Sequence, residues 1–106
     1  MKVAPFVAEA SDVYPLHVAA KHYTRDGSAC DQGVTLILAH AGGMHKECWE
    51  PILDRLLSQT EDGPGLIVKD AWSIDSPNHG HSAVLNYEAL RTKWLDACTR
   101  DHTFSL

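Results

Sequence analysis

Hydrophobic residues recur at every second position near the amino terminus of the chain. Within residues 14–23, Leu16, Val18 and Ala20 follow this spacing. A period of two residues is typical of a strand that buries one face. We therefore expect an edge or hairpin strand here, followed by a polar turn region over residues 24–33.

A second hydrophobic segment shows no alternation. Residues 34–39 read Val-Thr-Leu-Ile-Leu-Ala, and a strand that is apolar on both faces is typical of a sheet covered by helices on each side. We therefore predict that this strand lies in the middle of a sheet. The glycine-containing segment 40–45 then ends the strand.

Helical spacing begins near Lys46. Apolar side chains follow at relative positions 0, 3, 4, 7 and 8, which form one stripe along a helix. Pro51 falls in the first turns of this helix, where a missing N–H costs little. The residues of the stripe are Trp49, Ile52, Leu53, Leu56 and Leu57.

The second half of the chain repeats the order of strand, loop and helix. We predict a strand from about Leu66 to Asp75, a turn over residues 76–80 and a helix from about Tyr87. This order favours an α/β fold with a parallel sheet and right-handed crossovers, built as one domain over residues 1–106. The apolar face of the last helix would comprise Leu90, Trp94, Ala97 and Cys98.

Composition excludes several classes of function. The formal net charge is −5, so no basic surface is available for nucleic acid or an anionic membrane. No apolar run approaches the roughly 20 residues that span a bilayer, and no signal peptide is evident at the start. The cysteines Cys30, Cys48 and Cys98 form no Cys-x-x-Cys pair, which favours free thiols inside the cell.

The loop after residues 34–39 is the first candidate site. Gly42 and Gly43 are adjacent there, and glycine lets backbone N–H groups point outward toward a ligand oxygen. In acyl transfer such amides stabilise the negative oxygen of the intermediate. The alternative is a plain turn between strand and helix in which the glycines only satisfy backbone geometry.

The second candidate site follows the second predicted strand. Asp75 lies where that strand ends, and its carboxylate can accept N–H groups of the turn behind it. His79 and His81 could bind a metal with His40 or His45, yet no carboxylate or thiolate completes a recognised zinc spacing. We therefore expect no metal and no cofactor.

Together the two segments resemble the α/β-hydrolase family. Residues 35–43, with Trp49 behind them, look like the strand and His-Gly oxyanion loop of that family, and residues 75–82 look like its Asp followed by Gly-x-Ser. The resemblance implies the amino-terminal part of an α/β-hydrolase fold, with strands of a mostly parallel sheet and flanking helices.

The resemblance also implies roles for individual residues. Gly42 is the best match for the oxyanion donor and Gly43 the next, while Ala41 stands where the family usually has glycine. The residues expected to support this loop are His40, Asp75 and His79.

Two longer stretches, residues 46–51 and 75–86, indicate a narrower group within this family. They are similar to filamentous-fungal hydrolases, including those of host-selective toxin clusters of the AK, AF and ACT type, many of them peroxisomal. This implies an ester- or thioester-type hydrolase of secondary metabolism or toxin biosynthesis, acting on a small-molecule carbonyl substrate. The expected location is the peroxisome or the cytoplasm, although the ending Phe104-Ser105-Leu106 lacks the basic residue of a peroxisomal address.

The serine nucleophile of the family is missing from the sequence. It lies in Gly-x-Ser-x-Gly, and Gly80-His81-Ser82 only begins like that motif because Val84 replaces the second glycine. We therefore expect a truncated protein that is inactive alone, since a complete domain has over roughly 200 residues. An unpaired strand edge would allow self-association. The alternatives are a small binding module and, ranked last, half of a nucleotide-binding domain, which would need a glycine motif that is absent.

Overall fold

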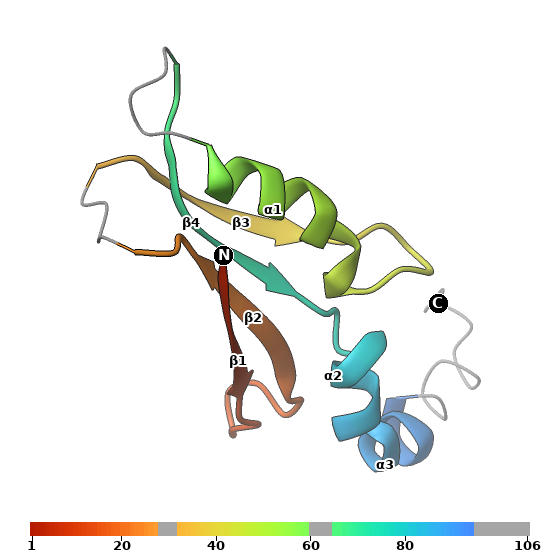
Figure 1. Cartoon of the computed structure of the whole chain (residues 1–106). Coiled ribbons are helices and arrows are strands. Elements are labelled where there is room, and N and C mark those ends of the chain that lie inside the picture. The colour runs from red at the N-terminus through yellow and green to blue at the C-terminus, as the bar shows by residue number, and fades with distance from the viewer. Residues whose placement is uncertain (28–31, 60–64, 95–106) are drawn as a thin grey trace.

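The computed structural model describes residues 1–27, 32–59 and 65–94. These residues form a four-stranded sheet with flanking helices, which confirms the expected α/β class (Figure 1). The strands are β1 (Lys2–Ala8), β2 (Val18–Thr24), β3 (Val34–Ala39) and β4 (Val68–Ile74). The helices are the 3₁₀ turn η1 (Lys46–Trp49), α1 (Glu50–Ser58), α2 (Gly80–Leu85), α3 (Tyr87–Ala89) and the π-helical turn η2 (Leu90–Trp94).

The strands follow the order β1-β2-β4-β3 across the sheet. The β3–β4 pair is parallel, whereas β1–β2 and β2–β4 are antiparallel, so the parallel part is smaller here than expected. The prediction that β3 lies in the middle was wrong, because β3 is an edge strand of the described sheet and β4 is internal. Consistently, Ile37 on β3 is 65% exposed.

Strand β1 was not predicted from the sequence. Its residues Lys2–Ala8 are almost all exposed, and Pro5 lies inside it. Proline lacks an N–H group and is tolerated in edge strands, where one side of the backbone has no partner. β1 forms a hairpin with β2, which is therefore a hairpin strand, as expected, but not an edge strand.

Helix α1 covers one face of the sheet and forms the core with it (Figure 1). The helical stripe was predicted correctly at Leu53 and Leu57, which are buried, whereas Ile52 is half-exposed at 51%. Pro51 lies in the first turn of α1, as expected. The buried cluster comprises Tyr23, Leu53, Leu57, Val68 and Ala71.

Arg25, just after β2, ties the end of α1 to the sheet. Its guanidinium donates to the carbonyl oxygens of Leu56, Leu57 and Gln59 at the end of the helix, and to that of Val68 on β4. The last carbonyls of a helix have no partner within the helix, and a cation is favourable there. Arg25 therefore fixes where α1 stops.

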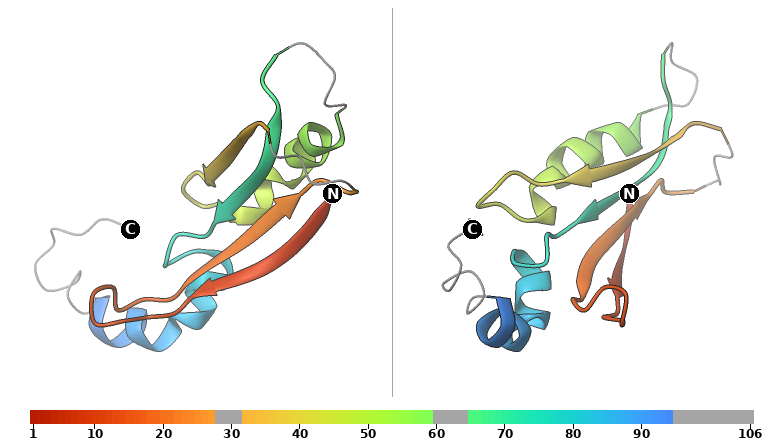
Figure 2. Two further views of the ribbon diagram at one scale, coloured as in Figure 1. Left: turned by 90° about the vertical axis from the view of Figure 1, so that its left-hand side faces the viewer. Right: turned by 180° about the vertical axis from the view of Figure 1, so that it is seen from behind.

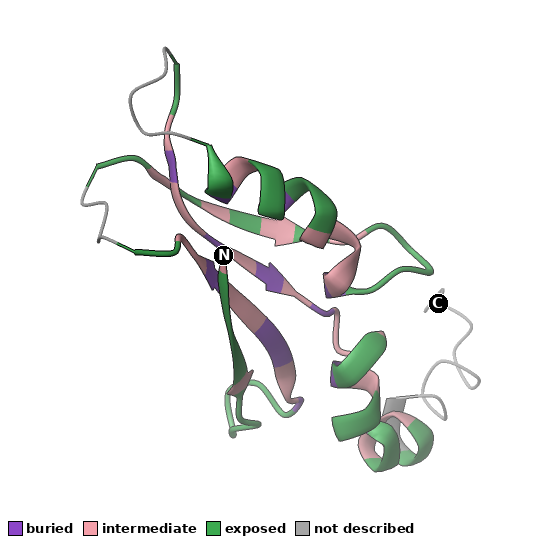
Figure 3. Cartoon of the chain, viewed as in Figure 1, coloured by how far each residue is buried: buried purple, intermediate pink, exposed green. Residues whose placement is uncertain are grey.

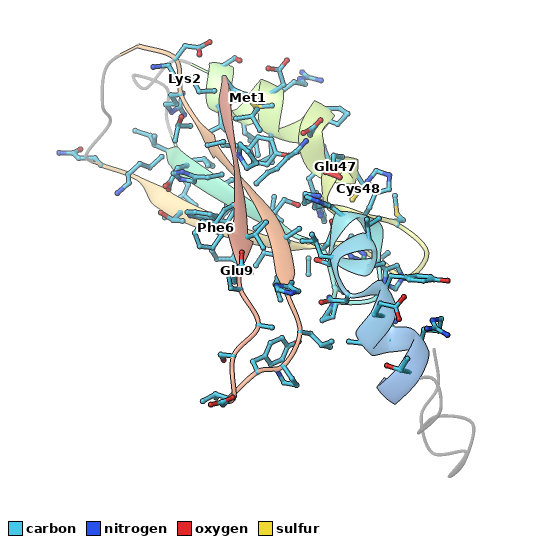
Figure 4. All side chains as sticks on the ribbon, turned by 90° about the horizontal axis from the view of Figure 1, so that it is seen from below. Met1, Lys2, Phe6, Glu9, Glu47 and Cys48 are labelled. Atoms are coloured by element: carbon cyan, nitrogen blue, oxygen red, sulfur yellow. The ribbon has the colours of Figure 1, made fainter. Side chains whose placement is uncertain are left out.

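The opposite face of the sheet has no helix over it in the described residues (Figure 2). An open apolar hollow of about 250 Å³ lies on this face. Figure 4 places Phe6 on the side of the sheet away from α1, where its ring meets Trp72 edge to face. The residues that line the hollow are Phe6, Ala8, Val18, Ala20, Ile37, Trp72 and Ile74.

The chain turns into a helix earlier than predicted after β4. α2 begins at Gly80, and α3 begins at Tyr87, where a helix was predicted. The Ser82 hydroxyl on α2 accepts the Ala19 N–H of β2, which holds the earlier helix against the sheet. Leu90 is half-buried, in keeping with the predicted face. Ala97 and Cys98, which were assigned to the same face, lie outside the described residues.

Candidate functional site

The glycine loop leaves the carboxyl end of β3. Residues 41–45 are exposed, and the N–H of Met44 donates to the Ala41 carbonyl to close a turn. Gly43 has φ +80°, a conformation that costs other residues strain. The loop therefore presents its backbone to solvent. It lies at the carboxyl ends of the parallel strands, next to the loop that follows the neighbouring strand β4 (Figure 3).

The two predicted oxyanion donors differ in the structure. The Gly43 N–H donates to Nε2 of His79 over 3.3 Å. Within the described residues the Gly42 N–H has no hydrogen-bond partner. Of the two amides, that of Gly42 is therefore the one available to a ligand oxygen.

His40 and His79 both contact main chain beside this loop. Nε2 of His40 accepts the Ser76 N–H over 3.0 Å, and its Nδ1 lies 2.9 Å from the Ala41 carbonyl oxygen. The two imidazole rings lie 4.9 Å apart, measured between their centroids. The structure thus brings together His40, His79 and the glycine loop.

Asp75 lies at the centre of the second loop and is completely buried. Its carboxylate accepts the N–H of His81, the type of contact that the sequence predicted. It also accepts the backbone N–H of Lys46 over 2.7 Å and forms an ion pair with the Lys46 ammonium over 2.8 Å. Asp75 therefore links the second candidate loop to the start of η1, which directly follows the glycine loop.

The ion pair shifts both groups toward their charged forms. Burial opposes the charge of Asp75, but hydrogen bonds from Lys46 outweigh it and hold the pKa of the carboxyl below its ordinary value. Burial likewise opposes the charge of Lys46, but hydrogen bonds to Asp75 and Glu47 outweigh it and raise the pKa of the ammonium. Lys46 was not predicted as a site residue, because a lysine at a helix start usually lies in solvent.

Gly80 makes the close approach to Asp75 possible. A Cβ atom built on Gly80 would lie 2.6 Å from both carboxylate oxygens of Asp75, and its φ is +53°. Only glycine avoids both the clash and the backbone strain. The Asp-to-Gly spacing that suggested a family marker thus has a direct structural reason.

Ser82 and Asn86 attach α2 to the sheet. The Ser82 hydroxyl accepts the Ala19 N–H over 2.8 Å and donates to the Asp75 carbonyl, and the side chain is fully buried. Asn86, also buried, accepts the His17 N–H and donates to the His17 carbonyl. Ser82 contacts no imidazole in the described residues, so it has the surroundings of a structural residue. Asn86 was missed, and its spacing of four residues from Ser82 was the available signal.

No group of three or more metal-ligating side chains occurs among residues 1–27, 32–59 and 65–94. His45 is exposed and lies 3.4 Å from Glu47. Cys48 is a free thiol, whereas Cys30 and Cys98 fall outside the described residues. In that described part, no helix is long and apolar enough to cross a membrane.

Comparison with known proteins gives relatives over most of the chain. It is 34% identical over 89 residues to the type I acyl-CoA thioesterase mpaH of Penicillium brevicompactum, covering 80% of this chain and 19% of the relative. It is 35% identical over 85 residues to the peroxisomal membrane protein LPX1 of Saccharomyces cerevisiae, covering 78% and 21%. The chain thus spans about a fifth of the length of the curated relatives it matches. No family model matches the chain.

A solved structure agrees with these relatives. The peroxisomal alpha-beta-hydrolase Lpx1 of Saccharomyces cerevisiae superposes with a TM-score of 0.62 at 27% identity, covering 80% of this chain and 26% of that protein. Sequence and fold therefore point the same way: the chain is related to the α/β-hydrolases, and its described residues build part of the α/β-hydrolase fold.

Proposed function

We propose that residues 1–106 carry the acyl-oxygen-binding loop of an ester- or thioester-type hydrolase of secondary metabolism or toxin biosynthesis. The Gly42 amide is the principal donor, and Gly43 lies next to it. The observation that carries this proposal is that Gly42 is exposed in the turn at the carboxyl end of β3 and that its N–H has no partner among the described residues. Main-chain amides that are fixed before the reaction stabilise the oxygen that becomes negative in acyl transfer.

The relatives support a thioester as the carbonyl substrate. One is named an acyl-CoA thioesterase, and another is named a peroxisomal protein. We extend the acyl thioester and a peroxisomal or cytoplasmic location to this chain as proposals. Its loop would then hold the thioester carbonyl oxygen.

The attacking group would have to come from outside these 106 residues. They contain no Gly-x-Ser-x-Gly, and the Ser82 hydroxyl is engaged in two buried hydrogen bonds. We therefore expect residues 1–106 alone to be inactive toward esters and thioesters.

The loop is tested by titrating ¹⁵N-labelled protein with hexanoate, whose carboxylate resembles an acyl oxyanion. The Gly42 amide resonance should move saturably. A Gly42→Pro variant, which lacks the N–H, should bind less hexanoate, whereas Gly42→Ala should bind as the parent does, since no atom lies within 4 Å of the added Cβ. Equal binding by the Pro and Ala variants would refute the role of the amide.

The open edge and face of the sheet support a second proposal, that two copies of residues 1–106 associate through β3. This strand has no charged residue, and edge strands without charges pair readily with other chains. Ile37 on β3 also extends the apolar hollow to the sheet edge. Ile37→Lys should shift sedimentation toward the monomer, while the control Ile52→Lys, on the exposed side of α1, should not; equal effects would refute pairing through β3.

A further inference from the structure

Two histidines connect the two candidate loops reciprocally. His40 belongs to the loop after β3, and its Nε2 accepts the Ser76 N–H of the loop after β4. His79 belongs to the loop after β4, and its Nε2 accepts the Gly43 N–H of the loop after β3. Each imidazole therefore binds the main chain of the opposite loop.

The hydrogen bonds fix the protonation of both rings. Nδ1 of His40 lies 2.9 Å from the Ala41 carbonyl oxygen, and Nδ1 of His79 lies 2.7 Å from Oδ1 of Asn78. Both oxygens only accept, so each Nδ1 carries the hydrogen, and each Nε2 facing an N–H must be unprotonated. A second proton on either ring would place a donor against a donor.

We propose that His40 and His79 form a pH-sensitive brace that positions the glycine loop. When both rings are neutral, the brace holds the Gly43 amide and leaves the Gly42 amide free. Protonation breaks both bonds between the loops and releases the Gly43 amide. Two positive rings whose centroids are 4.9 Å apart also repel each other.

Charged groups around the brace are paired with one another. On η1, Lys46 pairs with the buried Asp75, and Glu47 pairs with Lys46 and His45. From β2, Lys21 reaches Glu47 and Glu50. At the start of α2 the exposed His81 contributes its backbone N–H to Asp75. None of these side chains bonds to either ring of the brace in the described residues, so the response to pH is assigned to His40 and His79 themselves.

Amide exchange followed by NMR tests the brace as the pH is lowered, with the protonation of each imidazole read from its own ring resonances in the same titration. After correction for intrinsic exchange, protection of the Gly43 and Ser76 amides should fall together by about 2- to 12-fold as both rings protonate, the worth of one neutral hydrogen bond. Constant protection while both rings protonate would overturn the brace.

Variants separate the two histidines. Gln supplies an oxygen acceptor that does not titrate, so His79→Gln should abolish the pH response at Gly43 and keep it at Ser76; His40→Gln should do the reverse. The control His81→Gln changes an exposed histidine and should leave both responses. A response that His81→Gln removes would contradict the assignment.

The effect of the brace on acyl-oxygen binding rests on the proposed function, whereas the hydrogen bonds of His40 and His79 can be tested without it. Hexanoate binding at Gly42, measured at neutral pH on the same sample, separates the two. If hexanoate does not bind but the Gly43 and Ser76 amides still respond to pH, the proposed function alone is overturned. If hexanoate binds but these amides do not respond to pH, the brace alone is overturned.

Discussion

Gly80→Ala is the substitution for which the structure gives the sharpest expectation. The added methyl group would lie 2.6 Å from each carboxylate oxygen of Asp75. No real Cβ atom approaches another atom so closely, so the carboxylate must move. Its movement breaks contacts with the Lys46 amide, the Lys46 ammonium and the His81 amide.

The expected cost has two parts. An L-residue at the positive φ of Gly80 costs about 1–2 kcal/mol. Disrupting a buried ion pair while its charges stay buried costs about 3–5 kcal/mol. We therefore expect the free energy of unfolding to fall by at least about 3 kcal/mol, a large share of the roughly 5–15 kcal/mol of a typical domain.

Urea unfolding followed by tryptophan fluorescence measures this loss, and two other glycines serve as matched controls. Gly43→Ala adds a methyl group at φ +80° with no atom within 4 Å, so it should show the backbone cost alone. Gly42→Ala introduces neither a clash nor a positive φ, so its free energy of unfolding should stay within about 0.5 kcal/mol of the parent value. A Gly80→Ala protein no less stable than Gly43→Ala would refute the argument from Asp75.

Two further predictions concern the same buried cluster. Because folding lowers the pKa of Asp75, the stabilisation from this carboxylate is present above its unfolded pKa of about 3.9 and is lost as the pH falls through its folded pKa. In urea melts at several pH values, Asp75→Asn should be less stable than the parent at neutral pH but should lose less stability below about pH 4. Parallel curves of stability against pH for the two proteins would contradict this. Ser82→Ala should lower the free energy of unfolding by about 1–3 kcal/mol because it leaves the buried Ala19 N–H unpaired; an unchanged melt would show that the bond contributes nothing.

Local patterns predicted helix α1 and the side chains that it packs against the sheet. The stripe that includes Leu53 and Leu57 depends on helical spacing, which the sequence contains directly. The place of β3 in the sheet was not predictable in that way, because strand order depends on pairing with residues far along the chain. The apolar pattern of β3 was assigned to an internal strand, yet Ile37 lies on an exposed face of the described residues.

In the candidate site, too, local features were predictable from the sequence and contacts between distant residues were not. A glycine pair after a strand indicated the loop, since backbone freedom is a property of the residue itself. Which amide stays free depends on His79, 36 positions away, and the burial of Lys46 depends on Asp75, 29 positions away. Such contacts follow from the fold, so the sequence suggested His79 and Asp75 without their partners and did not suggest Lys46.

We propose that residues 1–106 hold a loop for an acyl oxygen but no attacking hydroxyl, and labelling with a serine-reactive fluorophosphonate tests this proposal most directly. Mass spectrometry of the treated protein should find no phosphonylated serine, with no acceleration of p-nitrophenyl acetate hydrolysis over a Ser82→Ala control. Phosphonate on Ser82 of the folded protein, lost together with ester hydrolysis in that control, would contradict the account.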